Sequence, residues 1–225
     1  MAGIMYGIGV GPGDPELMTI KAVKRIRELN VIAIPHKDKE KCTSYEIARQ
    51  AVPEIIEKEC LCLHMPMTKD EEALKRSHDE AAEAVIERLK QGEDVGFLTL
   101  GDVSIYSTFA YLAERVISEG YETQLVSGIP SFCAAAARLN LPLVTGSEEL
   151  HIIPASYQVS HALKLPGVKV LMKAGRQMSA VKEEIKNSGL TAVMVENCGM
   201  EEERIYLNLD EIPDTAGYYS LLIVR

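Results

Sequence analysis

The first half of the chain alternates between short apolar runs and amphipathic stretches, the pattern of strands that are followed by helices. The apolar runs predict strands at residues 5–10, 31–35, 59–63, 94–100 and 122–126. The clearest helix covers residues 68–91, where Leu74, Ala81, Val85 and Leu89 keep helical spacing. Because strands and helices alternate, the pattern predicts an α/β domain with a mostly parallel sheet and flanking helices.

The first predicted helix follows a glycine-rich turn. Asp14 and Pro15 offer a capping side chain and then a proline at the first helical position. The helix is expected to carry one apolar face, formed by Leu17, Ile20, Val23 and Ile26. Together with the strands on either side it predicts a βαβ unit.

The pattern changes after Pro142. Strands are predicted at residues 150–154, 168–172, 191–196, 204–209 and 218–224, with helices only near Ser160 and at 177–187. The last two strands have no helix between them and are expected to pair as a hairpin. We therefore predict an N-terminal α/β domain over residues 1–126 and a C-terminal mixed α+β domain over residues 127–225.

Three predicted strands end in glycine-containing turns, at residues 7–15, at Gly101-Asp102 and at Ser127-Gly128. Open α/β sheets bind ligands at the carboxyl ends of their strands, and glycine lets a ligand approach the backbone closely. Asp102 would supply a fixed acceptor there. The alternative is an ordinary turn in which Asp102 caps the next helix, predicted at residues 105–119. The first turn fits neither the dinucleotide fingerprint nor a P-loop.

Composition narrows the class of protein. The chain has 225 residues and a net charge of −9, and its basic residues form no long run, which argues against a nucleic-acid binder. The five cysteines include no CxxC pair and suggest free thiols in a reducing cytoplasm. The histidines and cysteines show no metal-ligand spacing. No leader or membrane-spanning run is evident, so a cytoplasmic protein without a metal site is expected.

Four motifs then occur in one order along the chain. They are GIGVGPGDPELMT at residues 7–19, LTLGDVSIYST at 98–108, VSGIPSFCAAA at 126–136, and VLMK at 170–173 with VENCG at 195–199. Together they resemble the tetrapyrrole methylase family, whose members transfer a methyl group from S-adenosylmethionine to corrin and sirohaem precursors. The opening segment, VIAIP at 31–35 and PASY at 154–157 are most similar to the branch that methylates C(20) of precorrin-2 or cobalt-factor II in cobalamin biosynthesis.

The resemblance implies the tetrapyrrole methylase fold, in which S-adenosylmethionine binds in a cleft between two α/β domains and leaves as S-adenosylhomocysteine. The residues that would contact it are Pro12, Leu100, Gly101, Asp102, Val103, Ile105, Pro130, Ser131, Met172, Asn197 and Cys198. Ile105 and Met172 would suit the apolar face of the adenine. The chain departs from the family at Val103, where proline is usual, and at Ser127, where proline is frequent.

Methyl transfer to a ring carbon needs donor and acceptor held in line, and the carbon must then lose a proton. Candidate bases are Asp102, Tyr106, Tyr218 and Tyr219. The carboxylates of the macrocycle need cations, for which we predict Lys173 and Arg176 and consider Lys37, Lys39, Lys41 and Arg138. Each of these side chains also has an ordinary structural interpretation as a cap, a core aromatic or a surface charge.

Three other functions are compatible with the residues. The chain could be a methylase that acts at another ring position, or a diphthine synthase, which would need an open cleft for a protein partner. It could also be a nucleotide-binding module without catalysis, although the missing dinucleotide and P-loop signatures argue against that. Members of the family are commonly homodimers, so a homodimer that binds a small tetrapyrrole is expected.

Overall fold

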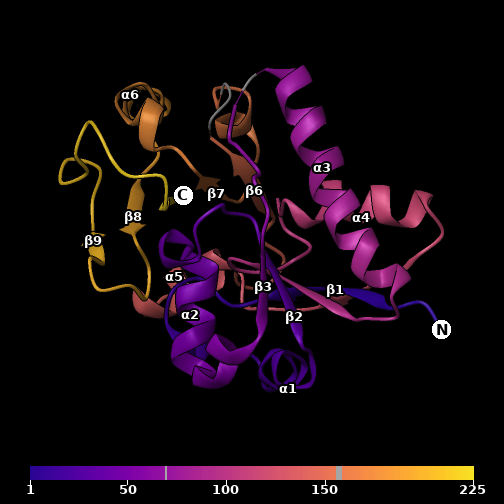
Figure 1. The fold of residues 1–225 in the computed structure, drawn as a ribbon. Helices are drawn as coiled ribbons and strands as arrows, with labels where there is room; N and C mark the ends of the chain where they lie inside the picture. Colours follow the sequence, from indigo (N-terminus) through magenta and orange to yellow (C-terminus); the bar gives the residue numbers. More distant parts are fainter. Residues whose placement is uncertain (69, 156–158) are drawn as a thin grey trace. The chain divides into compact units, whose positions relative to one another are not determined.

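The computed structural model describes residues 1–68, 70–155 and 159–225. It divides into two compact units, Met1–Pro130 and Ser131–Arg225, which Figure 1 shows in indigo to magenta and in orange to yellow. The boundary predicted from the sequence follows Val126, and the division in the structure follows Pro130.

The first unit is built on a five-stranded sheet in which every paired strand is parallel, in the order β3-β2-β4-β1-β5. The strands are β1 Ile4–Gly9, β2 Val31–Ile34, β3 Glu59–Cys62, β4 Val95–Thr99 and β5 Glu122–Val126. The helices are α1 Ile20–Glu28, α2 Thr43–Ala51, α3 Glu71–Lys90 and α4 Phe109–Ser118, with short 3-10 turns at Pro15–Leu17, Lys39–Lys41 and Pro53–Glu57. This confirms the predicted parallel sheet with flanking helices.

The helices cover both faces of this sheet because the chain reverses its direction across it. From β1 to β3 it moves one way, and from β3 to β5 it moves back, so right-handed crossovers place α1 and α2 on one face and α3 and α4 on the other (Figure 1). Ile8 and Ile26 belong to the first face, and Phe97 and Leu112 to the second. All four side chains are fully buried.

The start of α1 differs from the prediction. Asp14 caps only the 3-10 turn Pro15–Leu17, through a 2.8 Å bond from the Glu16 N–H. Met18 then returns to extended backbone, and Thr19 caps α1 by accepting the Ala22 N–H at 3.1 Å. Ile20, predicted to face the core, is the first residue of α1 and is 74% exposed, whereas Val23 and Ile26 pack in the core as predicted.

The second unit contains a mixed sheet, as predicted, and its strands stand in the order β6-β7-β10-β8-β9. Its strands are β6 Leu150–Pro154, β7 Val168–Met172, β8 Ala192–Glu196, β9 Arg204–Tyr206 and β10 Ser220–Val224. Its helices are α5 Ser131–Arg138 and α6 Met178–Ser188, with 3-10 turns at Ala162–Lys164 and Gly175–Gln177. β6 and β7 run parallel, and the other pairs are antiparallel.

The predicted hairpin of the last two strands is wrong. β10 lies between β7 and β8, whereas β9 pairs only with β8 at the edge of the sheet. Burial explains the difference: all five residues of β10 are buried and need neighbours on both sides, whereas the three residues of β9 are largely exposed. Leu171, Met194 and Leu222 lie on the face of this sheet that packs with α6 residues such as Met178.

Among the described residues, none of the helices is both long and apolar enough to cross a bilayer.

The packing of α3 on α4 gives the first unit a pH-dependent stability. His78 of α3 stacks on Tyr111 with ring centroids 5.1 Å apart, and burial, followed by the nearby Arg115 charge, lowers its pKa despite the opposing effect of Asp79. Unfolding therefore becomes easier as the pH falls below about 6.5, because only the unfolded histidine protonates readily there. In His78→Phe this slope of the unfolding free energy should disappear in urea titrations between pH 7 and 5, and in the exposed control His64→Gln it should persist.

Candidate functional site

The carboxyl ends of β1 and β4 are joined by two glycines. The N–H of Gly11 donates to the Gly101 carbonyl at 3.2 Å, and the N–H of Gly101 donates to the Gly11 carbonyl at 2.7 Å. Both glycines have a positive φ, 79° and 73°, which other residues adopt only with strain. The first two glycine turns predicted from the sequence therefore form one paired corner.

The third turn packs on the same corner without any intervening side chain. A Cβ added to Gly128 would lie 2.2 Å from the Gly101 carbonyl oxygen, and one added to Gly9 would lie 2.6 Å from the Gly128 nitrogen. Thr19, a residue that the sequence analysis did not assign to the site, adds a 3.1 Å bond from its hydroxyl to the Ser127 carbonyl. The corner is therefore a close contact of three backbones at the ends of adjacent strands.

This corner lies between β1 and β4, where the direction in which the chain adds strands to the sheet reverses. The chain leaves β1 toward α1 on one face and leaves the neighbouring β4 toward α4 on the other face. In open α/β sheets the connections diverge at such a point, and the crevice between them is where ligands bind. The topology thus points to the same place as the glycines.

Asp102 ties the corner together. Its Oδ1 accepts the Ser104 N–H at 2.8 Å and also the Ser104 hydroxyl, and its Oδ2 accepts the Gly128 N–H at 2.9 Å. Burial raises the pKa of this carboxyl, but the bonds from Ser104 and Gly128 outweigh burial, and the net pKa is lowered. The side chain is only 8% exposed, so these bonds form out of bulk water.

These contacts correct one interpretation of Asp102 and bear on another. It does not cap α4, which begins at Phe109 and whose first N–H is accepted by the Ser107 hydroxyl at 3.1 Å. A carboxylate with a lowered pKa and both oxygens already accepting bonds is also poorly suited to take a proton from a substrate. The geometry makes Asp102 a link between the β4 and β5 corners.

In the second unit, the predicted residues gather at the end of the sheet where β7 and β8 terminate. Met172 ends β7, and Asn197 follows β8. The antiparallel strand between them, β10, begins at this same end of the sheet. The N–H of Lys173 donates to the Ser220 carbonyl at 3.2 Å, and the N–H of Asn197 donates to the Tyr219 carbonyl at 3.1 Å. Lys173 and Asn197 have positive φ values of 61° and 52°, so both strands end in sharp turns.

Comparison with known proteins places this architecture. The sequence model of the tetrapyrrole (corrin/porphyrin) methylase family matches residues 5–213. The chain belongs to the tetrapyrrole methylase family. A probable cobalt-precorrin-2 C(20)-methyltransferase of Methanocaldococcus jannaschii is 34% identical, over 98% of this chain and 95% of that protein. The cobalt-precorrin-2 C(20)-methyltransferase of Salmonella typhimurium is 29% identical, over 100% and 97%.

Solved structures agree on the fold. The uroporphyrin-III C-methyltransferase of Thermus thermophilus, solved in complex with S-adenosyl homocysteine, matches with a TM-score of 0.70 at 19% identity, over 99% of this chain and 97% of that one. Two sheets, one parallel and one mixed, are thus the tetrapyrrole methylase fold, as the resemblance implied.

At Val103 this methylase departs from its family's usual proline. The side chain is buried and packs on β1: a Cβ at Gly7 would lie 2.6 Å from its Cγ2 and 2.8 Å from the Phe109 ring. The turn closes with a 3.3 Å bond from the Ile105 N–H to the Asp102 carbonyl. Packing on a glycine strand thus holds a turn that proline would have constrained.

The other residues predicted in the first unit of the methylase lie around this corner. Pro12 is buried next to Gly11, and Leu100, half-buried, packs with the α1 and α2 core. Pro130 is half-buried and ends the unit. Tyr106 has a φ of 48° and is 51% exposed, which leaves its ring largely accessible to solvent. Because these turns fill residues 102–108, α4 begins later than predicted.

Aromatic and cationic side chains lie at the end of the second sheet where β10 begins. The rings of Tyr218 and Tyr219 meet edge-on with centroids 5.3 Å apart, and the Lys173 Nζ lies 5.4 Å from the Tyr218 ring centre. Both tyrosines precede β10, which begins at Ser220 and not at the predicted Tyr218. The side chain of Arg176 and all of Tyr157 lie outside the described residues.

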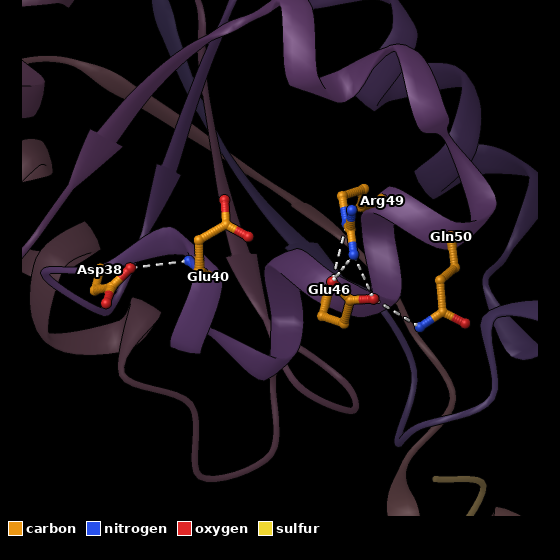
Figure 2. A network of polar contacts seen from close by, with 5 residues as sticks. All are labelled: Asp38, Glu40, Glu46, Arg49 and Gln50. Carbon is orange, nitrogen blue, oxygen red and sulfur yellow. Dashed lines mark hydrogen bonds and ion pairs between the residues drawn. The ribbon is translucent and has the colours of Figure 1, made fainter. Parts of the chain in front are cut away.

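Two of the other cations considered as substrate ligands are paired with acids. Arg138 makes a two-pronged ion pair with Glu203, including a 2.8 Å bond from its Nε to Oε1. Lys41 lies 3.3 Å from Asp38. Figure 2 shows Asp38 beside Glu40 in the 3-10 turn, and Glu46 of α2 held by Arg49 and Gln50. Asp38 and Glu40 partly offset the positive charge of residues 37–41, and Glu46 offsets that of Arg49.

No disulfide joins any of the cysteines in the part of the chain that the structure describes. Cys60 and Cys62 share one face of β3, with sulfur atoms 3.9 Å apart. Burial, and then the neighbouring Cys62, raise the pKa of Cys60 to about 12, so it stays a neutral thiol. Within the described ranges no cluster of His, Cys, Asp and Glu could hold a metal ion.

Proposed function

We propose that this methylase transfers the methyl group of S-adenosylmethionine to C(20) of precorrin-2 or cobalt-factor II during corrin ring biosynthesis. The observation that carries the proposal is the similarity along almost the whole chain to C(20)-methyltransferases, at 34% and 29% identity. The corner of Gly9, Gly101 and Gly128 supports it, because these glycines let three strand ends pack in direct backbone contact, and ligands of open α/β sheets bind at strand ends.

The proposed donor contacts keep their assignment from the resemblance. They are Pro12, Leu100, Gly101, Asp102, Val103, Ile105 and Pro130 in the first unit, and Ser131, Met172, Asn197 and Cys198 in the second. When bound, S-adenosylmethionine supplies a methyl group on a sulfonium, a leaving group that needs no acid. The task left to the protein is to hold the acceptor carbon in line, and to accept its proton afterwards. Tyr106 and Tyr219 stay the candidate bases.

Two experiments test the proposal. Calorimetry of the full chain with S-adenosylhomocysteine, ATP and NAD should show binding of the first alone. Incubation with S-adenosylmethionine and precorrin-2, or its cobalt form, should give a product whose new methyl is located at C(20) by NMR. A methyl at another ring position would contradict the C(20) assignment. Binding of NAD or ATP in place of S-adenosylhomocysteine would contradict the assignment of S-adenosylmethionine as the donor.

That the protein is a cytoplasmic homodimer stays a prediction.

Lys173 is proposed to bind a carboxylate of the macrocycle, together with Arg176. Lys173→Gln should raise the KM for the tetrapyrrole about tenfold, the cost of one charged contact, and leave the affinity for S-adenosylhomocysteine unchanged. The matched control is Lys186→Gln, which neutralises an exposed lysine of α6 in the same unit. An unchanged KM in Lys173→Gln would remove this lysine from the substrate site.

A further inference from the structure

The turn after β8 depends on one carboxylate that the sequence does not single out, that of Glu203. Asn197 and Gly199 in this turn both have left-handed backbone, with φ of 52° and 75°. Because this conformation is unfavourable for a residue with a side chain, the turn needs specific bonds to hold it. The Asn197 side chain supplies one, from its Nδ2 to the Glu202 carbonyl at 3.3 Å.

Glu203 supplies the others. Its Oε2 accepts the Gly199 N–H at 2.7 Å, and the Cys198 side chain also bonds to this carboxylate. From the other side the Arg138 Nε donates to Oε1 at 2.8 Å and to Oε2 at 3.1 Å. The Glu203 side chain is 12% exposed, whereas that of Arg138 is 58% exposed. One carboxylate therefore joins a backbone N–H, a thiol and a guanidinium.

The charge of Glu203 is stable in this setting. Burial raises its pKa, but the bonds from Arg138 and Gly199, the positive charge of Arg138 and the Cys198 bond outweigh burial and leave the pKa lowered. The side chain is thus ionised at neutral pH, and it can accept from several donors at once.

Arg138 connects the Glu203 carboxylate to helix α5. It is the last residue of α5, and Ser131 is the first, so the helix spans about 12 Å between them. Ser131 is a proposed donor contact, and so are Asn197 and Cys198. The Arg138–Glu203 pair therefore links the far end of the helix that starts at one proposed contact to the turn that carries two others. All of these residues belong to the second unit.

We propose that Glu203 is a positioning residue for the methyl donor: it locks the turn at residues 197–199 against α5, and the turn then contacts the donor. The proposal rests on the proposed function, because that function assigns the turn to the donor. Glu203 itself takes no part in bond making or breaking.

The test compares variants of the full chain. Glu203→Ala should weaken S-adenosylhomocysteine binding about tenfold and raise the KM for S-adenosylmethionine to match. The KM for the tetrapyrrole, and kcat at saturating donor, should stay within about twofold. Arg138→Gln should cost less, because the carboxylate can still accept from Gly199. Glu201→Gln, which neutralises an exposed acid of the same turn, should change nothing.

A second readout needs no ligand. Amide exchange at Gly199 should be about tenfold faster in Glu203→Gln, since glutamine replaces one acceptor oxygen and the charge by an NH2 donor, which would face the donors Gly199 and Arg138. Donor affinity unchanged in Glu203→Ala, or Gly199 exchange unchanged in Glu203→Gln, would overturn the role of Glu203. Wild-type protein that does not bind S-adenosylhomocysteine at all would instead reject the proposed function, and this inference with it.

Discussion

Replacing Gly128 with alanine is expected to lower the free energy of unfolding by about 3 kcal/mol and to weaken S-adenosylhomocysteine binding about 100-fold. The added Cβ would lie 2.2 Å from the Gly101 carbonyl oxygen and 2.7 Å from the Gly9 carbonyl carbon. Both neighbours are backbone atoms, which cannot rotate away as a side chain could. The three strand ends must therefore separate, and they carry the proposed donor site. Urea unfolding and calorimetry measure the two effects.

Gly120→Ala is the matched control. Gly120 has a φ of 85°, and a Cβ there would meet nothing within 4 Å. Alanine should cost only the strain of the left-handed backbone, about 1–2 kcal/mol, and leave donor affinity unchanged. Wild-type stability and affinity in Gly128→Ala would show that the corner can relax, and would remove close backbone packing as the basis of the site.

Asp102→Ala is expected to have the second large effect, a loss of about 3 kcal/mol of stability together with at least tenfold weaker donor binding. Without the carboxylate, the N–H groups of Ser104 and Gly128 lose their acceptor at a site that is 8% exposed. The β4 and β5 corners then lose the polar link that Asp102 provides. The affinity for S-adenosylhomocysteine and the urea midpoint should fall in parallel.

The control for Asp102 lies at the other end of the same strand. The Asp94 Oδ1 accepts the Ile4 N–H at 2.7 Å, so Asp94→Ala removes a comparable carboxylate-to-backbone bond away from the corner. It should cost stability and leave donor affinity intact. If Asp102→Asn abolished turnover with affinity and stability unchanged, Asp102 would be a catalytic base and its role as a link would be wrong.

Local signals predicted much of the first unit. Short apolar runs bounded by glycine and proline located all five of its strands. The helix predicted at residues 68–91 is α3, whose start is capped by Asp70: its Oδ1 accepts the Ala73 N–H at 3.1 Å. The start of α1 was missed because Asp14 and Pro15 satisfy the rules for a helix start as well as they satisfy those for a 3-10 turn. That choice depends on Thr19, which caps α1 and bonds to Ser127.

The candidate site was predictable as residues but not as contacts. The glycine turns and Asp102 could be read as strand ends with an acceptor, yet their partners are distant in sequence: Gly11 pairs with Gly101, and Asp102 with Gly128. Glu203 gave no sequence signal, since it is one of three consecutive glutamates and only folding brings Arg138 to it.

By itself, the sequence determined the class of most elements, the parallel character of the first sheet and the membership of the methylase family, because periodicity and local motifs are carried by residues close together in the chain. Only the tertiary structure decided the order of the strands, the position of β10 inside the second sheet and the partners of Asp102 and Glu203. These depend on which backbones meet, and such meetings are set by burial and by hydrogen bonds between distant segments.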